Sequence, residues 1–391
     1  MRVYEYERYP MLIQGEAMST KENLKIEEFK EEMNSYSDES LFNITSFGAD
    51  LTFRELSTMY DEGELEKPEM QRHYVWSKLE ASRFIDSLLL GLPVPSIFLA
   101  KTKDNKRLIV DGYQRIMTVN DYMKGIFSGD NKVFKLYNSE IINYRWRGKT
   151  FQELSIEQQR AIKTYPIHAI IFEQKAPEDD TGMYQIFERI NTGGRTLKAQ
   201  EIRNCVYHGE LNQLLITLNN ELVWRRILNS MTPDSRMQDI ELILRFLAFK
   251  DIKDDSDLKQ QINLVKYLNQ YMSKHSSLAI GESDNIRNDF LMTMNVIYKG
   301  LGKNAFRNGK FKNNEFKYTS KINPVIFDAV SVATYKNIKS GKQTTLSEEA
   351  YQSLLLNKDF QEVIKHRTTN TTNILDRQQL SYQILFGDNN E

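Results

Sequence analysis

The stretch 107–123, RLIVDGYQRIMTVNDYM, predicts a strand that runs directly into a helix. The apolar run RLIV is typical of a buried strand, and apolar residues then recur at helical spacing from Ile116 onward. Asp111 and Gly112 lie at the junction, and glycine suits such a tight turn. The first-turn N–H groups of the helix have no partners within it, and they carry the positive end of the helix dipole.

This junction is a candidate site for a phosphate group. Gln114 and Arg115 fall in the first turn of the helix, where an amide and a bidentate guanidinium can converge on an anion. Asp111 stands at the strand end, where a carboxylate can hold a divalent cation or a water. A plainer interpretation stays open, in which Asp111 caps the helix and Arg115 lies in solvent.

Outward from this junction, the chain divides into three parts. Residues 1–44 form an acidic leader, for which disorder and a short amphipathic helix near 20–33 are both open. Residues 45–180 predict a small mixed sheet with helices around it. The expected strands are 96–102, 107–110 and 166–172, and the expected helices include 53–60 and 77–90, the latter with a capping box from Ser77.

Residues 181–391 are helical in pattern almost throughout, with no repeat that would indicate a solenoid. The segment 237–249 is apolar nearly all round, which predicts a buried helix. Arg245 and Asp239 would then need partners, most simply each other or nearby charges. The other expected helices are 181–191, 197–207, 211–228, 257–274, 286–301 and 324–338.

Composition excludes several classes of protein. The 391 residues contain 40% hydrophobic and 27% charged residues, as in an ordinary globular protein, and no apolar run is long enough to span a membrane. The N-terminus has no secretory signal pattern. The single cysteine, Cys205, excludes a disulfide scaffold and a cysteine-based metal site, and it fits a cytoplasmic protein. We interpret Cys205 as a buried core residue.

Two further stretches carry polar residues of interest. Gln71 and Arg72 precede the helix that begins after Ser77, and alone they indicate little. The segment 187–204, FERINTGGRTLKAQEIRN, has a glycine pair between two helices. Such a pair allows the backbone to approach a ligand, although it is more often a simple turn. It is not a P-loop, because no Gly-Lys-Ser/Thr follows.

Together these motifs resemble the N-terminal domain family of GmrSD-type restriction endonucleases. The resemblance rests on five segments in family order: PEMQRHYVW (68–76), LLGLPVPSIFL (89–99), VDGYQR (110–115), FERINTGGRTLKAQEIRN (187–204) and RMQDIELILRFLAF (236–249). It implies a ParB/sulfiredoxin-like core, giving an α+β chain with a mixed-sheet N-terminal part and a largely helical C-terminal part. It also implies binding or hydrolysis of an NTP, base unknown, and a role in defence against foreign or modified DNA.

The resemblance also implies roles for individual residues. Asp111, Gln114 and Arg115 would be catalytic, with Asp111 also holding Mg²⁺. Tyr113 departs from the family, which usually has glutamine there, so binding is a safer expectation than turnover. The implied phosphate-binding residues are Gln71, Arg72, Gly112, Tyr113, Asn191, Gly193, Gly194 and Arg203.

Nothing in the sequence indicates a nuclease module, because no histidine has a second histidine at metal-ligand spacing. We expect His168, in an apolar strand, to be a core residue. Residues 303–321 combine basic and aromatic residues, which is typical of nucleic-acid contact, and a solvated loop whose aromatics dock on the helical domain is the plainer interpretation that stays open. The basic candidates there are Lys303, Arg307, Lys310, Lys312 and Lys317.

The leading hypothesis is therefore a cytoplasmic Mg²⁺-dependent NTPase of a restriction system. One alternative is a nucleic-acid-binding module without turnover, and another is a sensor subunit that recruits a separate nuclease. The expected partners are a nucleotide, DNA and such a nuclease, with no membrane, and the oligomeric state is left open.

Overall fold

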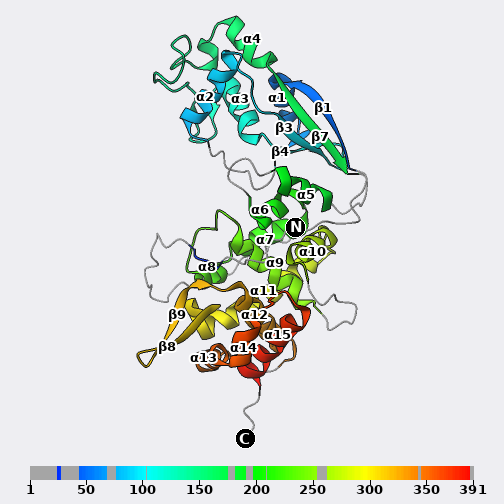
Figure 1. Cartoon of the computed structure of the whole chain (residues 1–391), viewed down its shortest axis with the longest axis vertical. Coiled ribbons are helices and arrows are strands. Elements are labelled where there is room, and N and C mark those ends of the chain that lie inside the picture. Colours follow the sequence, from blue (N-terminus) through cyan, green and yellow to red (C-terminus); the bar gives the residue numbers. More distant parts are fainter. Residues whose placement is uncertain are drawn as a thin grey trace, which may run out of the picture.

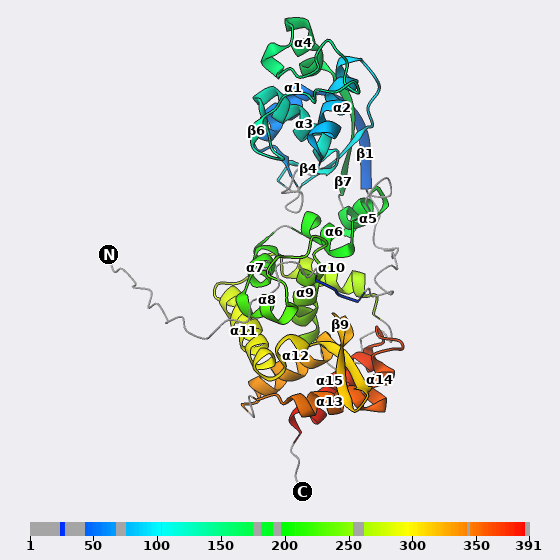
Figure 2. The same cartoon turned by 90° about the vertical axis from the view of Figure 1, so that its left-hand side faces the viewer.

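The computed structural model describes residues 24–27, 44–67, 76–102, 104–174, 181–190, 197–207, 209–252, 262–341 and 345–387. It confirms the α+β class: a mixed five-stranded sheet in the N-terminal part, followed by a mostly helical C-terminal part (Figure 1). The predicted ParB/sulfiredoxin-like relationship stays a prediction. Figure 2 shows the two parts at opposite ends of the molecule, with α5 and α6 between them.

The sheet has the strand order β1-β7-β3-β4-β2. β3 runs parallel to β7 and antiparallel to β4, while β1 is antiparallel to β7 and β2 is parallel to β4. The expected strands are confirmed, with small changes at their ends. The bounds are β1 Ile44–Thr52, β2 Leu65–Glu66, β3 Ile97–Lys101, β4 Arg107–Asp111 and β7 Pro166–Gln174.

Helices α1 to α4 belong to this N-terminal part. The predicted capping box of α2 is present, since Ser77 Oγ accepts from the backbone N–H of Glu80 while the Glu80 carboxylate accepts from Ser77. Residues of α1, α2 and α3 share one buried cluster with Leu99 and Ile109 of the sheet. The bounds are α1 Phe53–Asp61, α2 Lys78–Leu89, α3 Tyr113–Lys124 and α4 Ile156–Thr164, with a 3-10 turn at Phe151–Glu153 and a small ribbon of β5 Ile126–Phe127 and β6 Lys132–Val133.

The opposite face of the sheet shares a core with the helical part. Leu108, Val110 and Phe172 belong to the same buried cluster as Tyr184 and Phe187 of α5. The helix bounds are α5 Thr181–Ile190, α6 Ala199–Val206, α7 Glu210–Asn219, α8 Leu222–Leu228, α9 Gln238–Lys250, α10 Leu264–Lys274, α11 Glu282–Leu301, α12 Pro324–Lys339, α13 Glu348–Leu356, α14 Lys358–Val363 and α15 Thr371–Phe386.

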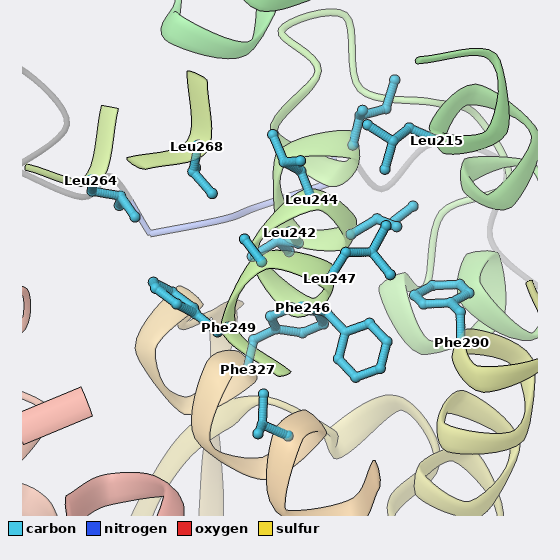
Figure 3. Close-up of a cluster of buried hydrophobic side chains, with 14 of the residues drawn as sticks. Leu215, Leu242, Leu244, Phe246, Leu247, Phe249, Leu264, Leu268, Phe290 and Phe327 are labelled. Atoms are coloured by element: carbon cyan, nitrogen blue, oxygen red, sulfur yellow. The ribbon is translucent and has the colours of Figure 1, made fainter. Parts of the chain in front are cut away.

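Helix α9 is the centre of this second core, as its apolar pattern predicts (Figure 3). Its buried Arg245 and Asp239 are both paired, although not with each other. Arg245 donates to Asp328 at 2.5 Å, and Asp239 accepts from Arg225 at 2.8 Å. Of the two expected alternatives, pairing with nearby charges is therefore the one that holds, because each side chain faces a different neighbouring element. Cys205 is fully buried, as predicted.

The structure corrects three further expectations. Segment 211–228 is two helices, α7 and α8, rather than one. His168 is not a core residue: strand alternation buries Ile167 and Ala169, so the imidazole faces the other way, where its Nδ1 lies 2.8 Å from Asp50 Oδ1 and its side chain is 51% exposed. In the leader, the described residues 24–27 include a β-bridge between Ile26 and Ile322 rather than a helix.

Candidate functional site

The turn between β4 and α3 is held by the geometry of Gly112. Its φ of 103° lies in the left-handed region, where side chains are strained. A Cβ at this position would also lie 2.3 Å from Cγ2 of Ile97 in β3. Gly112 is therefore required both for the turn and for the close approach of the two strands, and it places the start of α3 at the end of β4.

The helix does not receive a side-chain cap at this turn. Gly112 is its N-cap residue, and it has no side chain with which to accept from the first N–H groups. The Asp111 carboxylate instead contacts Arg115, with Oδ2 2.5 Å from Nη2. The plainer interpretation, with Asp111 as a cap and Arg115 in solvent, therefore does not describe this turn. The positive end of the α3 dipole lies beside a half-exposed carboxylate.

Arg115 is held in a fixed place. Its Nη1 donates to the backbone carbonyl of Pro95 at 3.0 Å, and its side chain is 11% exposed. These two bonds use two of the five N–H donors of a guanidinium. The Pro95 contact has no signal in the sequence, because a backbone carbonyl leaves no motif.

Tyr113 and Gln114 point to different surroundings. Tyr113 is buried in the core cluster beside α1, and burial together with the neighbouring Tyr60 raises the pKa of its phenol. The predicted phosphate contact of the Tyr113 side chain does not fit this inward position. Gln114 Oε1 accepts from the backbone N–H of Trp76 at 3.3 Å, so it joins the start of α3 to the segment before α2.

Five predicted phosphate-binding residues lie outside the described residues. They are Gln71, Arg72, Asn191, Gly193 and Gly194. Their approach to the β4–α3 turn therefore stays a prediction. On the C-terminal side of Gln71 and Arg72, the first described residue is Trp76, whose backbone N–H donates to Gln114 Oε1.

Arg203 lies in a buried network in the helical part. It is fully buried on α6, donates to Asn269 at 2.8 Å, and pairs with Glu241 of α9 at 2.8 Å. These contacts hold Arg203 inside the helical core, so its position does not fit the predicted phosphate contact. Its neighbour Asn204 is also buried, and within the described part of the chain its amide oxygen and nitrogen have no hydrogen-bond partner. Such a group calls for a water or ligand.

The basic segment 303–321 is a hairpin rather than a loop. Its strands are β8 Arg307–Lys312 and β9 Glu315–Ile322. Arg307 donates to the carbonyls of Lys303 and Ala305, so its guanidinium closes the base of the hairpin. Lys310, Lys312 and Lys317 are exposed on the strands. The expected docking of aromatics holds for Phe306, which is fully buried, and for Phe316 and Tyr318, which contact the core.

The described residues contain no group of three or more His, Cys, Asp and Glu side chains that could hold a metal ion. They also include no helix that is both long and apolar enough to cross a membrane. At the β4–α3 turn, Asp111 is the candidate ligand, and a nucleotide-bound Mg²⁺ needs only one or two protein carboxylates besides the phosphates.

The fold and this turn thus define the class of protein: an α+β domain with an arginine in the first helical turn after a strand. Residues 53–208 match the family described as GmrSD restriction endonuclease, N-terminal domain. The match covers less than half of the chain, and it includes both the β4–α3 turn and α6. This stretch is similar to GmrSD-type N-terminal domains, and the similarity suggests an association with restriction systems. No curated protein matches the chain.

Proposed function

We propose that the β4–α3 turn binds the phosphates of an NTP, and that the chain hydrolyses this NTP with Mg²⁺ in the service of a restriction system. The observation that carries the proposal is Arg115. Its guanidinium is fixed by Pro95 and Asp111 beside a helix start that has no side-chain cap. A restrained guanidinium loses little freedom when it binds phosphate, and the uncapped N–H groups supply further donors.

Asp111 would have two roles in this site. Without ligand it balances the charge of Arg115. With a nucleotide present, a Mg²⁺ bound to the phosphates would replace Arg115 as the partner of this half-exposed carboxylate. Arg115 would then contact the phosphates. Nucleotide binding would thus replace the Arg115–Asp111 ion pair by two contacts, one between Asp111 and Mg²⁺ and one between Arg115 and a phosphate. DNA and a separate nuclease subunit are the macromolecular partners that we propose for such a system.

Calorimetry with ATP, GTP, CTP and UTP, each with and without Mg²⁺, tests the binding step. We expect one or more of these nucleotides to bind, and Arg115→Ala to weaken binding by at least about tenfold, since a hydrogen bond to a charged group contributes about 1.5–3 kcal/mol. Arg160→Ala is the matched control, because Arg160 is an exposed arginine on α4 of the same domain. If Arg115→Ala bound nucleotide as tightly as wild type and the control did too, the proposal of a nucleotide site at this turn would be wrong.

The hydrolysis step needs a separate measurement. Phosphate release should require Mg²⁺, and Asp111→Asn should lower the rate while nucleotide binding without Mg²⁺ is retained. Melting temperatures of Arg115→Ala, Arg115→Lys and Asp111→Asn identify any loss that is due to unfolding. Arg115→Lys keeps the charge but not the bidentate fork, so it should recover only part of the affinity. Binding without phosphate release would limit the function to nucleotide sensing.

A further inference from the structure

One side of the β8–β9 hairpin carries lysines with little to neutralise them. Lys310 pairs directly with Lys317 across the two strands, and the next pair toward the tip is Lys312 with Glu315. Pairs at alternate positions share a face of the ribbon, so these four side chains point the same way. All four are exposed, and the only ion pair here is between Lys317 and Glu315, at 3.4 Å, among the described residues.

This arrangement is unfavourable for folding alone. Like charges directly opposite each other on a strand pair repel, and an opposite charge or a neutral residue at either position would relieve the repulsion. The lysine side extends toward the base of the hairpin, where exposed Lys321 and Lys25 directly precede the paired residues Ile322 and Ile26. A stretch of positive charge that the fold does not need is typical of a surface for a polyanion.

The aromatic residues occupy the other side of the ribbon. Phe311 pairs with Phe316, and Tyr318 follows at the alternate position. Tyr318 stacks on Tyr351 of α13 with a ring-centroid distance of 6.1 Å, and its hydroxyl donates to Glu348 at 3.0 Å. The hairpin is thus fixed to α13 by one side and presents its lysines on the other, so the lysine side is both rigid and accessible.

The separation of lysines from aromatics selects one kind of polyanion. Proteins that hold single-stranded nucleic acid place aromatic rings among the cations, so that unpaired bases stack on them. The lysine side of this hairpin has cations but no aromatic rings. It therefore suits the phosphate backbone of a duplex, which is contacted without stacking on bases. Because the chain is linked to restriction systems, DNA is the relevant duplex.

We propose that the lysine side of the β8–β9 hairpin is a docking surface for the phosphate backbone of double-stranded DNA. Lys310, Lys312 and Lys317 form its centre, and Lys321 and Lys25 extend it toward the base of the hairpin. The surface uses no residue of the β4–α3 turn. The proposal of DNA docking and the proposal of nucleotide binding can therefore be confirmed or contradicted independently of each other.

Fluorescence anisotropy with a labelled DNA duplex of about 20 base pairs, measured between about 50 and 200 mM salt, tests this surface. Wild type should bind with a slope of log affinity against log salt of about −3 to −4.5, since each phosphate contact contributes about −0.9 and the surface has three central lysines and two that extend it. The variant K310E/K312E/K317E should bind at least tenfold more weakly at the lowest salt. The control K299E/K358E/K365E changes the same charge at exposed lysines of α11, α14 and the turn after α14, and should stay near wild type.

Three results would overturn the proposal. The first is that the hairpin lysines make no specific contribution. Either wild type does not bind the duplex, or the hairpin variant and its control lose equal affinity, and equal losses would indicate an effect of overall charge alone. The second is tighter binding of a single strand or of an RNA duplex of the same length. The third is a loss of duplex binding in Phe311→Ala, which would indicate stacking by the exposed ring. Melting temperatures well above the assay temperature for all variants exclude unfolding as the cause.

Discussion

At the scale of single residues, Gly112 and Arg115 set the geometry of the candidate site. Gly112 allows β4 to turn into α3 while β3 stays within contact distance. Arg115 then reaches back over this turn to Pro95, in the segment before β3. The turn and the arginine are thus coupled: a change in the glycine would shift the helix start and with it the guanidinium.

We expect Gly112→Ala to destabilise the protein by about 2–5 kcal/mol, because left-handed strain costs about 1–2 kcal/mol and an overpacked methyl about 1–3 kcal/mol. Gly91→Ala is a matched control. Its φ of 72° is also left-handed, but nothing lies within 4 Å of the added Cβ, so only the strain remains. Urea unfolding of both variants measures the difference. Equal losses would mean that the contact with Ile97 relaxes without cost.

The sequence predicted part of this residue-scale picture. A strand, a glycine turn and a helix with Arg115 in its first turn could be expected, because these features are local in the chain. The partner of Arg115 could not, since Pro95 is distant in sequence and contributes only a backbone carbonyl. The inward direction of Tyr113 depends on how α3 packs, which its neighbours in sequence did not reveal. The outward direction of His168 follows from alternation with Ile167 and Ala169, a local signal that the expectation of a core residue overlooked.

At the scale of elements, the success of prediction follows the apolar pattern. Strands β3, β4 and β7 have buried apolar residues and were expected. Strand β1 was not, because most of its residues are exposed and its sequence does not alternate; it forms through nine paired residues on β7. The β8–β9 hairpin was missed for a different reason. Charged and aromatic residues alternate along both of its strands, and Asn313 and Asn314 form the turn, but the basic and aromatic composition favoured a nucleic-acid contact or a loop.

The docking of the hairpin can be tested on its aromatic side. Phe316→Ala should cost about 2 kcal/mol, because the partly buried ring contacts the helical core. Phe311→Ala should cost less than about 1 kcal/mol, since that ring is 57% exposed. Chemical unfolding compares the two variants. A larger loss from Phe311→Ala would contradict the assignment of the two rings to different environments.

At the scale of the whole molecule, the described leader residues are tied to the C-terminal part. The backbone N–H of Glu27 donates to the carbonyl of Ile322 at 2.9 Å, the N–H of Ile322 donates to Lys25 at 3.0 Å, and Ile26 is buried. This strand-like contact joins positions almost three hundred residues apart. Sequence patterns did not indicate it, because a single bridge has no periodicity.

Two truncations test that contact. Removal of residues 1–27 should lower the melting temperature by about 5 °C relative to removal of residues 1–23, because burial of one isoleucine contributes about 1.5–3 kcal/mol. The second truncation is the control, since it keeps the residues that pair with β9. Identical melting curves for the two truncated chains would show that the bridge adds no stability.

The central claim is that a nucleotide binds at the β4–α3 turn, and hydrogen–deuterium exchange locates this directly. In the presence of Mg²⁺ and the nucleotide that binds best in calorimetry, backbone amides of residues 111–116 should exchange more slowly, because phosphate oxygens would accept their hydrogen bonds. The same peptides in Arg115→Ala should lose most of that protection. Unchanged exchange at 111–116, with protection elsewhere in the chain, would contradict the account.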